Sequence, residues 1–309
     1  MSPVPVVIGV NYHRVGTVDP ADPFHRLHTV ATRVFEAQLA WMLDHGTLVS
    51  PDRVRDAADL DAVNFVVCFD DVSVSALPHI RALVDAGLPV TVSPAGLLAD
   101  RGNGHRDRVY AIERLVAPQA IAAHVRRVIP GRADEPFYYL TKAADLDPHW
   151  VRRELVAPLL DRIPDRAAPL LARRGYLSWQ QLRPLARDQL VTVANHTWSH
   201  DNLEALPTPD LNREILDGDA AIRRHLGIAP RYLTLPFGHF SRQVALESLK
   251  CLSEHDYRGL LWVAKAGITV SGRDHAQALH LPRLRAATTI EEFPEQIGTA
   301  IRNATATLT

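Results

Sequence analysis

The sequence contains few cysteines and no long apolar run, and these absences exclude several classes of protein. Only Cys68 and Cys251 are present among 309 residues, so a disulfide framework is not indicated and a reducing compartment is expected. No apolar run approaches the roughly 20 residues that a membrane-spanning helix needs. The N-terminal segment has no basic region before its short apolar run, which is typical of a first strand rather than of a signal peptide. We therefore expect a cytoplasmic protein without a membrane partner.

The sequence also lacks an excess of charge of either sign. Its 35 acidic and 34 basic residues nearly cancel, and no long run of like charge occurs. This balance argues against a nucleic-acid partner. Apolar residues make up 47% of the chain, which is enough for a sizeable core in one large α/β domain or two smaller ones.

Short apolar runs alternate with amphipathic segments along most of the chain. The runs predicted as strands are PVVIGV, NFVVCF, PVTVSP, LVTVAN, YLTLPFG and GLLWVA. The segments predicted as helices include VFEAQLAWMLDHG, ALPHIRALVDAG, LSWQQLRPLARDQ, PDLNREILDGDAAIRRHLG and VALESLKCLSEHDY. This alternation predicts an α/β fold with a largely parallel sheet or barrel.

The alternation stops between the PVTVSP run and Leu177. Residues from about 101 to 175 have helical periodicity and only one short strand-like run, FYYL. We interpret residues 1–309 as a single domain with a helical insertion at about 101–175, which would act as a lid or select the substrate. The alternative is a helical bulge that buries only its own apolar face.

Two adjacent carboxylates, Asp70 and Asp71, end the apolar run FVVCF. Burying two neighbouring ionised carboxylates is costly unless a positive group lies beside them. Far downstream, His196 and His200 follow another apolar run, four residues apart. Two neutral imidazoles and one carboxylate can bind Zn²⁺ or a similar ion, and the second carboxylate can then act as a general base on water. In a chain with fifteen histidines such a pair could also arise by chance.

Taken together, these motifs resemble the polysaccharide deacetylases, the NodB-homology or carbohydrate esterase family 4 group. The motifs FDD and NHTWSH resemble the aspartate and histidine motifs of the family, and VNYHRV with FEAQLAWMLDHG is similar to the start of its exopolysaccharide N-deacetylase branch. YLTLPFG resembles the proline-aromatic-glycine loop, and LHLPRLRA resembles the Pro-Arg strand near the end of that branch. The resemblance covers most of the chain outside the insertion.

The resemblance implies a fold, a reaction and a set of site residues. The fold is a distorted (β/α) barrel of about seven strands. Asp70 would be the catalytic base, while Asp71, His196 and His200 would bind a divalent metal. The metal is expected to be Zn²⁺, with Co²⁺, Ni²⁺ or Mn²⁺ as alternatives. The reaction would be hydrolysis of an N-acetyl group on an amino sugar.

The sequence departs from the family pattern at three points. Val72 replaces the glycine that follows the aspartate pair, and the loop can differ there because valine does not share the backbone freedom of glycine. Thr234 replaces an arginine that orients the base in the family. We expect Arg283 to pair with Asp70 instead, the alternative being an ordinary surface ion pair.

The third departure concerns the histidine that protonates the leaving amine in the family. His280 lies in the corresponding region and is the candidate for this role, with His275 as a second choice. We also expect four residues to contact the substrate. They are His13 at the exit of the first strand, Trp198, Phe237 and Gly238.

A cytoplasmic enzyme would not meet the cell wall, so we expect a small N-acylated amino sugar, sugar nucleotide or related metabolite as the substrate. An extracellular polysaccharide or peptidoglycan deacetylase is the first alternative. A barrel that has lost catalysis and binds carbohydrate is the second. The sequence is compatible with a homo-oligomer.

Overall fold

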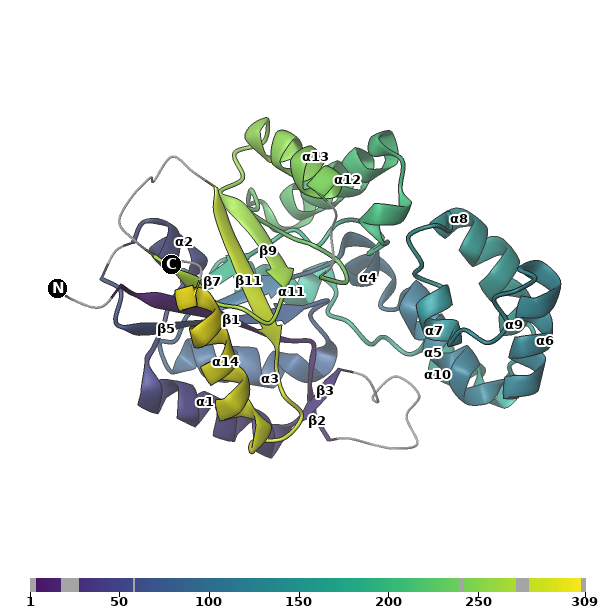
Figure 1. Cartoon of the computed structure of the whole chain (residues 1–309), viewed down its shortest axis with the longest axis horizontal. Helices are drawn as coiled ribbons and strands as arrows, with labels where there is room; N and C mark the ends of the chain where they lie inside the picture. Colours follow the sequence, from purple (N-terminus) through teal and green to yellow (C-terminus); the bar gives the residue numbers. More distant parts are fainter. Residues whose placement is uncertain (1–3, 18–27, 58, 239–241, 271–277, 307–309) are drawn as a thin grey trace.

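Seven parallel strands form a nearly closed barrel (Figure 1). The computed structural model describes residues 4–17, 28–57, 59–238, 242–270 and 278–306. In order around the barrel, the strands are β7 (Val191–Val193), β6 (Val90–Ser93), β5 (Val63–Asp70), β1 (Val6–Tyr12), β11 (Leu279–Arg285), β9 (Gly259–Val263) and β8 (Tyr232–Thr234). Asn195 joins the two ends of this order, because its N–H donates to Tyr232 O and its carbonyl accepts from Thr234 N, both at 2.8 Å. The expected distorted barrel of about seven strands is confirmed.

Short strands extend this sheet at its margins. β10 (Ile268–Thr269) pairs antiparallel with the start of β1, and β4 (Thr47–Leu48) pairs parallel with β5. β2 (Arg14–Gly16) and β3 (Thr29–Ala31) form a separate two-stranded ribbon just after β1.

The strands alternate between a helix-covered face and the barrel interior. Ile8, Val10, Phe65 and Val67 pack outward in the cluster that includes α1 and α3 side chains, whereas Val66 and its interior neighbours pack among themselves. The helices around the barrel are α1 (Thr32–His45), α2 (Pro51–Arg55), α3 (Leu77–Asp85), α4 (Gly96–Arg101), α11 (Trp179–Ala186), α12 (Thr208–Leu226), α13 (Arg242–Ser253) and α14 (Glu292–Ala306). Gly227, in a left-handed conformation, ends α12 as the sequence predicts.

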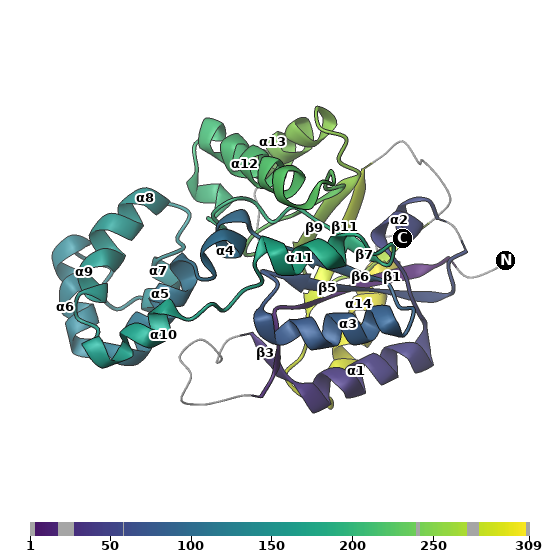
Figure 2. The same ribbon diagram turned by 180° about the vertical axis from the view of Figure 1, so that it is seen from behind.

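A group of helices projects from one side of the barrel (Figures 1 and 2). It contains α5 (His105–Leu115), α6 (Pro118–Val128), α7 (Phe137–Leu140), α8 (Pro148–Trp150), α9 (Ala157–Leu160) and α10 (Ala168–Ala172), which we call the helical insertion. Its apolar side chains form their own core cluster. The FYYL run belongs to α7 and is not a strand. The division into one domain with an insertion stays our interpretation.

Polar contacts join the helical insertion to the barrel. Arg14 forms an ion pair with Asp107 of α5 at 3.3 Å and also donates to Tyr176 Oη at 3.2 Å. Tyr176 Oη donates to Asp107 at 3.0 Å, so the three side chains form one closed network. Arg152 pairs with Asp201, which follows the second metal-site histidine. No described helix has the length and apolar character needed to cross a membrane.

Candidate metal and catalytic site

The strand register brings the sequence-predicted residues to the carboxyl end of the barrel interior. Every second side chain of β5 points into the barrel, and these are Val66, Cys68 and Asp70. On β11 the inward-pointing side chains are Leu281 and Arg283. Since parallel strands end at the same edge, their last interior side chains converge. This convergence places Asp70 and Arg283 in contact although they are far apart in the sequence.

Three side chains form a site that can hold a metal ion. Asp71 Oδ1 lies 3.8 Å from His196 Nε2 and 3.6 Å from His200 Nε2, and one ligand atom from each residue lies within 4.8 Å of the others. Asp71 Oδ1 and His196 Nε2 are buried and have no hydrogen-bond partner. A cation bound between them would satisfy both atoms, so the residues present fit a divalent metal.

The backbone after each strand turns sharply to aim these ligands. Asp71 has φ of +58°, and both Thr197 and His200 lie in the same left-handed region at +64° and +59°. His196 Nδ1 donates to the carbonyl oxygen of Thr234 at 2.9 Å. This contact fixes the tautomer in which Nε2 carries a free lone pair, the form that binds a metal.

Burial sets the protonation state of the ligands. It lowers the pKa of His196 and, together with Arg106, lowers the pKa of His200 to about 4. Both imidazoles are therefore neutral near pH 7, as metal ligands must be. Burial raises the pKa of Asp71 to about 6, and the neighbouring Asp70 carboxylate adds to this rise while His196 opposes it.

Asp70 is held in a buried pair with Arg283. Arg283 Nη1 and Nη2 donate to Oδ1 and Oδ2 of Asp70 at 2.6 and 3.0 Å, and Asn11 Nδ2 donates to Oδ2 at 2.9 Å. The pairing expected from the sequence is present, and with 0% side-chain exposure for Arg283 it is not a surface ion pair. Burial by itself would raise the pKa of Asp70, but Arg283 and His196 lower it well below its usual range. Asp70 is therefore ionised near neutral pH in the resting protein.

Gly9 on β1 leaves room for this pair. A Cβ atom at Gly9 would lie 2.5 Å from Arg283 Cγ, which is closer than real Cβ contacts. Thr234, which occupies the position of the family arginine, is fully buried and its hydroxyl contacts Ser93 Oγ at 2.9 Å. The guanidinium that contacts Asp70 belongs to Arg283 on β11.

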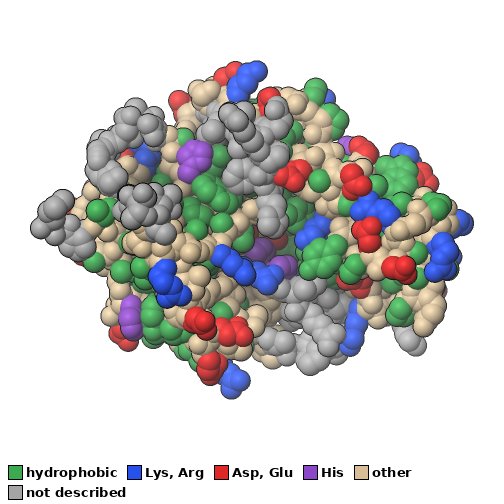
Figure 3. Space-filling model, viewed as in Figure 1, with side chains coloured by type: hydrophobic (Ala, Val, Ile, Leu, Met, Phe, Trp, Pro, Cys, Tyr) green, Lys and Arg blue, Asp and Glu red, His purple; other side chains and the backbone are tan. Residues whose placement is uncertain are grey.

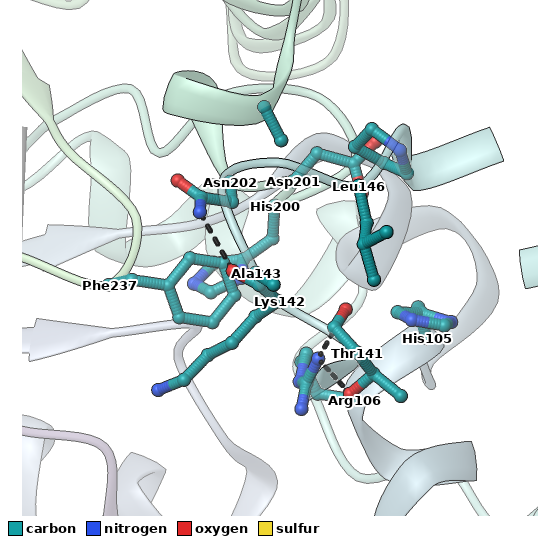
Figure 4. Close-up of a pocket in the computed structure, with 12 residues that line it drawn as sticks. His105, Arg106, Thr141, Lys142, Ala143, Leu146, His200, Asp201, Asn202 and Phe237 are labelled. Carbon is teal, nitrogen blue, oxygen red and sulfur yellow. Dashed lines mark hydrogen bonds between the residues drawn. The ribbon is translucent and has the colours of Figure 1, made fainter. Parts of the chain in front are cut away.

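The site opens into a cavity of about 730 Å³ with walls from the barrel and the helical insertion. Asp70, Asp71, His196 and His200 lie on its wall. Figure 3 shows a hollow in this face of the molecule, with histidine side chains at its bottom and Lys or Arg side chains at its rim. A small pocket next to His200, lined by residues of the helical insertion and by Phe237, adjoins this region (Figure 4).

Two of the residues expected to contact substrate line this cavity. His13 lies on the wall and stacks on His28, with ring centroids 4.6 Å apart. Burial lowers the pKa of His13 to about 3, against a smaller opposing effect of Asp70, so it is a neutral hydrogen-bonding group. Phe237 has φ of +63° and packs its ring 4.9 Å from that of His200.

Three other expectations need correction. His280 does not reach the site, because it lies an odd number of residues before Arg283 on β11, which turns its side chain outward against Trp262. Trp198 packs its ring on Gly96 of α4 and is absent from the cavity wall. Gly238 has φ of +74° and packs against Val263, so it shapes the loop rather than the wall. His275 lies outside the described residues.

Val72 keeps a glycine-like backbone. Its φ is +49°, although a β-branched residue is strained in this region, and its side chain is fully buried in the cluster between the barrel and its outer helices. The loop is fixed by Leu177 N, which donates to Val72 O at 2.9 Å, and by Val74 N, which donates to Gly175 O at 2.9 Å. The loop therefore retains the turn that a glycine would give, and packing of the valine side chain offsets the strain.

The sequence interpretation missed several residues of the cavity. Asn11 follows Val7 and Gly9 on the inner face of β1, and this alternation is a signal that could have identified it. Arg106, Tyr138 and Lys142 reach the cavity from the helical insertion, and no local motif marks them.

Comparisons with known proteins agree with this geometry. The family model described as polysaccharide deacetylase matches residues 137–259, a segment that contains both histidines and the Phe237 loop. Over this segment the chain is similar to the polysaccharide deacetylase family. Enzymes of this family hydrolyse N-acetyl amide bonds. The matched segment is less than half of the chain, and the structure brings Asp70, Asp71 and Arg283 to it from outside.

Solved structures share the fold of this chain across nearly its whole length. The Streptococcus pyogenes deacetylase PplD, in complex with acetate, is 13% identical, with a TM-score of 0.59 and coverage of 98% of this chain and 99% of that one. IcaB from Ammonifex degensii is 15% identical, with a TM-score of 0.58 and coverage of 96% and 98%. A de-N-acetylase from Aggregatibacter actinomycetemcomitans is 16% identical, with a TM-score of 0.54 and coverage of 93% and 99%. None of the curated proteins compared matches the sequence.

Proposed function

We propose that the chain is a metal-dependent hydrolase that removes an N-acetyl or similar N-acyl group from an amino sugar. The observation that carries this proposal is the convergence of unpartnered ligand atoms of Asp71 and His196 with His200, directly beside a second carboxylate. Zn²⁺ is the first candidate, since two imidazoles and one carboxylate with open positions suit it, and Co²⁺, Ni²⁺ and Mn²⁺ are the alternatives.

The chain's own groups divide the remaining work. A bound divalent ion would polarise the acyl carbonyl and increase the acidity of water. Asp70 is held ionised by Arg283 and accepts the proton of the attacking water. Oxygen of water forms the new bond to the acyl carbon, and the C–N bond breaks as the proton taken up by Asp70 passes to the leaving nitrogen, so that the products are a free amine and a carboxylic acid and Asp70 is ionised again. His13 and Phe237 on the cavity wall contact the sugar.

A small or medium-sized substrate fits this cavity better than a long polymer. Its volume of about 730 Å³ falls in the usual range for small-molecule sites. The helical insertion contributes part of the wall, which favours the proposed role in substrate selection. This enclosure supports an N-acylated sugar, sugar nucleotide or amino-sugar metabolite over a cell-wall polysaccharide.

Release of acetate from N-acetyl amino sugars tests the proposed function. Chelator-treated protein should be inactive, Zn²⁺ or Co²⁺ should restore hydrolysis, and Asp70→Asn should remain inactive after the same treatment. A metal-restored wild type that hydrolyses no N-acyl amino sugar, monomeric or polymeric, would favour the inactive carbohydrate-binding barrel instead. Turnover of chitin-type or peptidoglycan polymers only would favour the extracellular alternative.

A further inference from the structure

Four cationic side chains on the cavity wall have no carboxylate partner in the part of the chain that the structure describes, namely Arg106, Lys142, Lys265 and Arg285. Arg106 donates to Tyr138 O, Thr141 O and Thr141 Oγ1, and not to a carboxylate. Lys142 and Arg285 also line the cavity without an ion pair among the described residues. The nearest carboxylates of the helical insertion are already engaged, because Asp107 pairs with Arg14 and Glu113 accepts from Tyr138 N at 2.8 Å. We call Arg106, Lys142 and Arg285 the cationic wall.

Arg106 and Lys142 of the cationic wall lie beside Phe237, and Phe237 in turn contacts His200. Arg106 Cζ and Lys142 Nζ lie 4.5 and 4.4 Å from the ring centroid of Tyr138, and 5.7 and 5.3 Å from that of Phe237. Phe237 also contacts His200, at 4.9 Å between ring centroids. Figure 4 shows Arg106, Lys142 and Phe237 grouped beside His200.

The cations of this wall repel one another. Burial, with additional repulsion from Arg106 and Arg285, lowers the pKa of Lys142 to about 8. Buried or crowded like charges are unfavourable unless an anion neutralises them. Glu292 is the only carboxylate on the described cavity wall besides Asp70 and Asp71, and it lies on the exposed surface of α14. The cavity wall therefore offers a site for an anion close to the reaction centre.

We propose that the substrate is an N-acyl amino sugar that carries a phosphate group, which the cationic wall binds while the acyl amide lies at the metal site. This inference rests on the proposed function and specifies its substrate class. A phosphate matches three neighbouring cations better than a single carboxylate does, since it carries more charge and more acceptor oxygens. Tyr138 and Tyr139 on the same cavity wall offer aromatic faces for the sugar or for an attached base.

Matched substrates and variants test this inference. The substrates are the methyl glycoside of N-acetylglucosamine, N-acetylglucosamine phosphate and UDP-N-acetylglucosamine, and the last two distinguish a sugar phosphate from a nucleotide sugar. For wild type, kcat/KM should be at least about tenfold higher for a phosphorylated substrate than for the neutral glycoside. Lys142→Gln and Arg285→Gln should each reduce this ratio by about tenfold, mainly through KM. Lys250→Gln, an exposed cation on α13, is the matched control and should leave the ratio unchanged.

A binding measurement separates the failure of this inference from the failure of the proposed function. Calorimetry should detect N-acetylglucosamine phosphate on wild type, with weaker binding at high salt and to Lys142→Gln. If binding behaves in this way but no substrate is hydrolysed, the proposed hydrolysis is wrong while the phosphate site stands. Equal hydrolysis of the neutral and phosphorylated sugars, with no change of the ratio in either variant, would overturn the phosphate proposal and leave the deacetylase intact. A preference for a carboxylate-bearing sugar would overturn it as well.

Discussion

Removing Arg283 should strongly destabilise the protein because it leaves Asp70 buried without its charge partner. Arg283→Met removes hydrogen bonds of 2.6 and 3.0 Å to Asp70 but keeps much of the side-chain volume in a site with no solvent exposure. Asn11 retains its contact of 2.9 Å with Asp70 and compensates only one oxygen. Breaking a buried ion pair from one side costs about 3–5 kcal/mol, and we expect a loss in this range.

Urea unfolding followed by circular dichroism measures this loss. Arg302→Met, an exposed arginine on α14, is the control and should change the free energy of unfolding by less than about 0.5 kcal/mol. The double variant Asp70→Asn with Arg283→Met removes both charges, and its loss should be smaller than the sum of the two single losses by at least about 1 kcal/mol. An Arg283→Met protein within about 1 kcal/mol of wild type would refute the claim that this pair is buried and coupled.

Two further predictions concern the loop after Asp71 and the contact between barrel and insertion. Val72→Gly should relieve the left-handed strain at φ +49° but lose a fully buried side chain. We expect the free energy of unfolding in urea to fall by about 1 kcal/mol and kcat/KM to stay unchanged. A large rise of KM would show that Val72 itself sets the substrate geometry. Arg14→Met removes the ion pair of 3.3 Å with Asp107 and should therefore speed proteolytic cleavage within residues 105–172. Arg126→Met changes an exposed arginine on α6 and should not change the cleavage rate. Equal cleavage of both variants would contradict the idea that Arg14 holds the helical insertion on the barrel.

Residues that end strands were the most predictable part of the site. Asp70 and Asp71 follow an apolar run, and His196 and His200 follow another, so the rule that parallel strands end at one edge was enough to bring them together. The alternation of strand and helix periodicity outside the insertion predicted a largely parallel sheet or barrel, and the family resemblance implied the distorted barrel of about seven strands. For Arg283 the sequence allowed either a pairing with Asp70 or an ordinary surface ion pair. Its register on β11 turns the side chain into the barrel and decides for the pairing with Asp70.

The sequence did not predict which side chains of a strand point into the barrel, or which residues of the helical insertion reach the cavity. His280 is close to Arg283 in the chain, but side chains on a strand alternate, and only the register shows which of the two points inward. Trp198 lies between the two histidines, yet the turn at Thr197 directs its ring to Gly96. Arg106 and Lys142 reach the cavity because of how the helical insertion packs, and such packing leaves no local sequence signal.

The metal content of three proteins tests the central claim most directly. Wild type, Asp70→Asn and Asp71→Ala are purified in parallel, loaded with Zn²⁺, desalted and analysed by mass spectrometry for bound metal. The account predicts about one ion per chain in wild type and in Asp70→Asn, and a large loss in Asp71→Ala, because Asp71 shares the site with His196 and His200 while Asp70 is engaged by Arg283. Equal metal loss in both variants, or no bound ion in wild type, would contradict it.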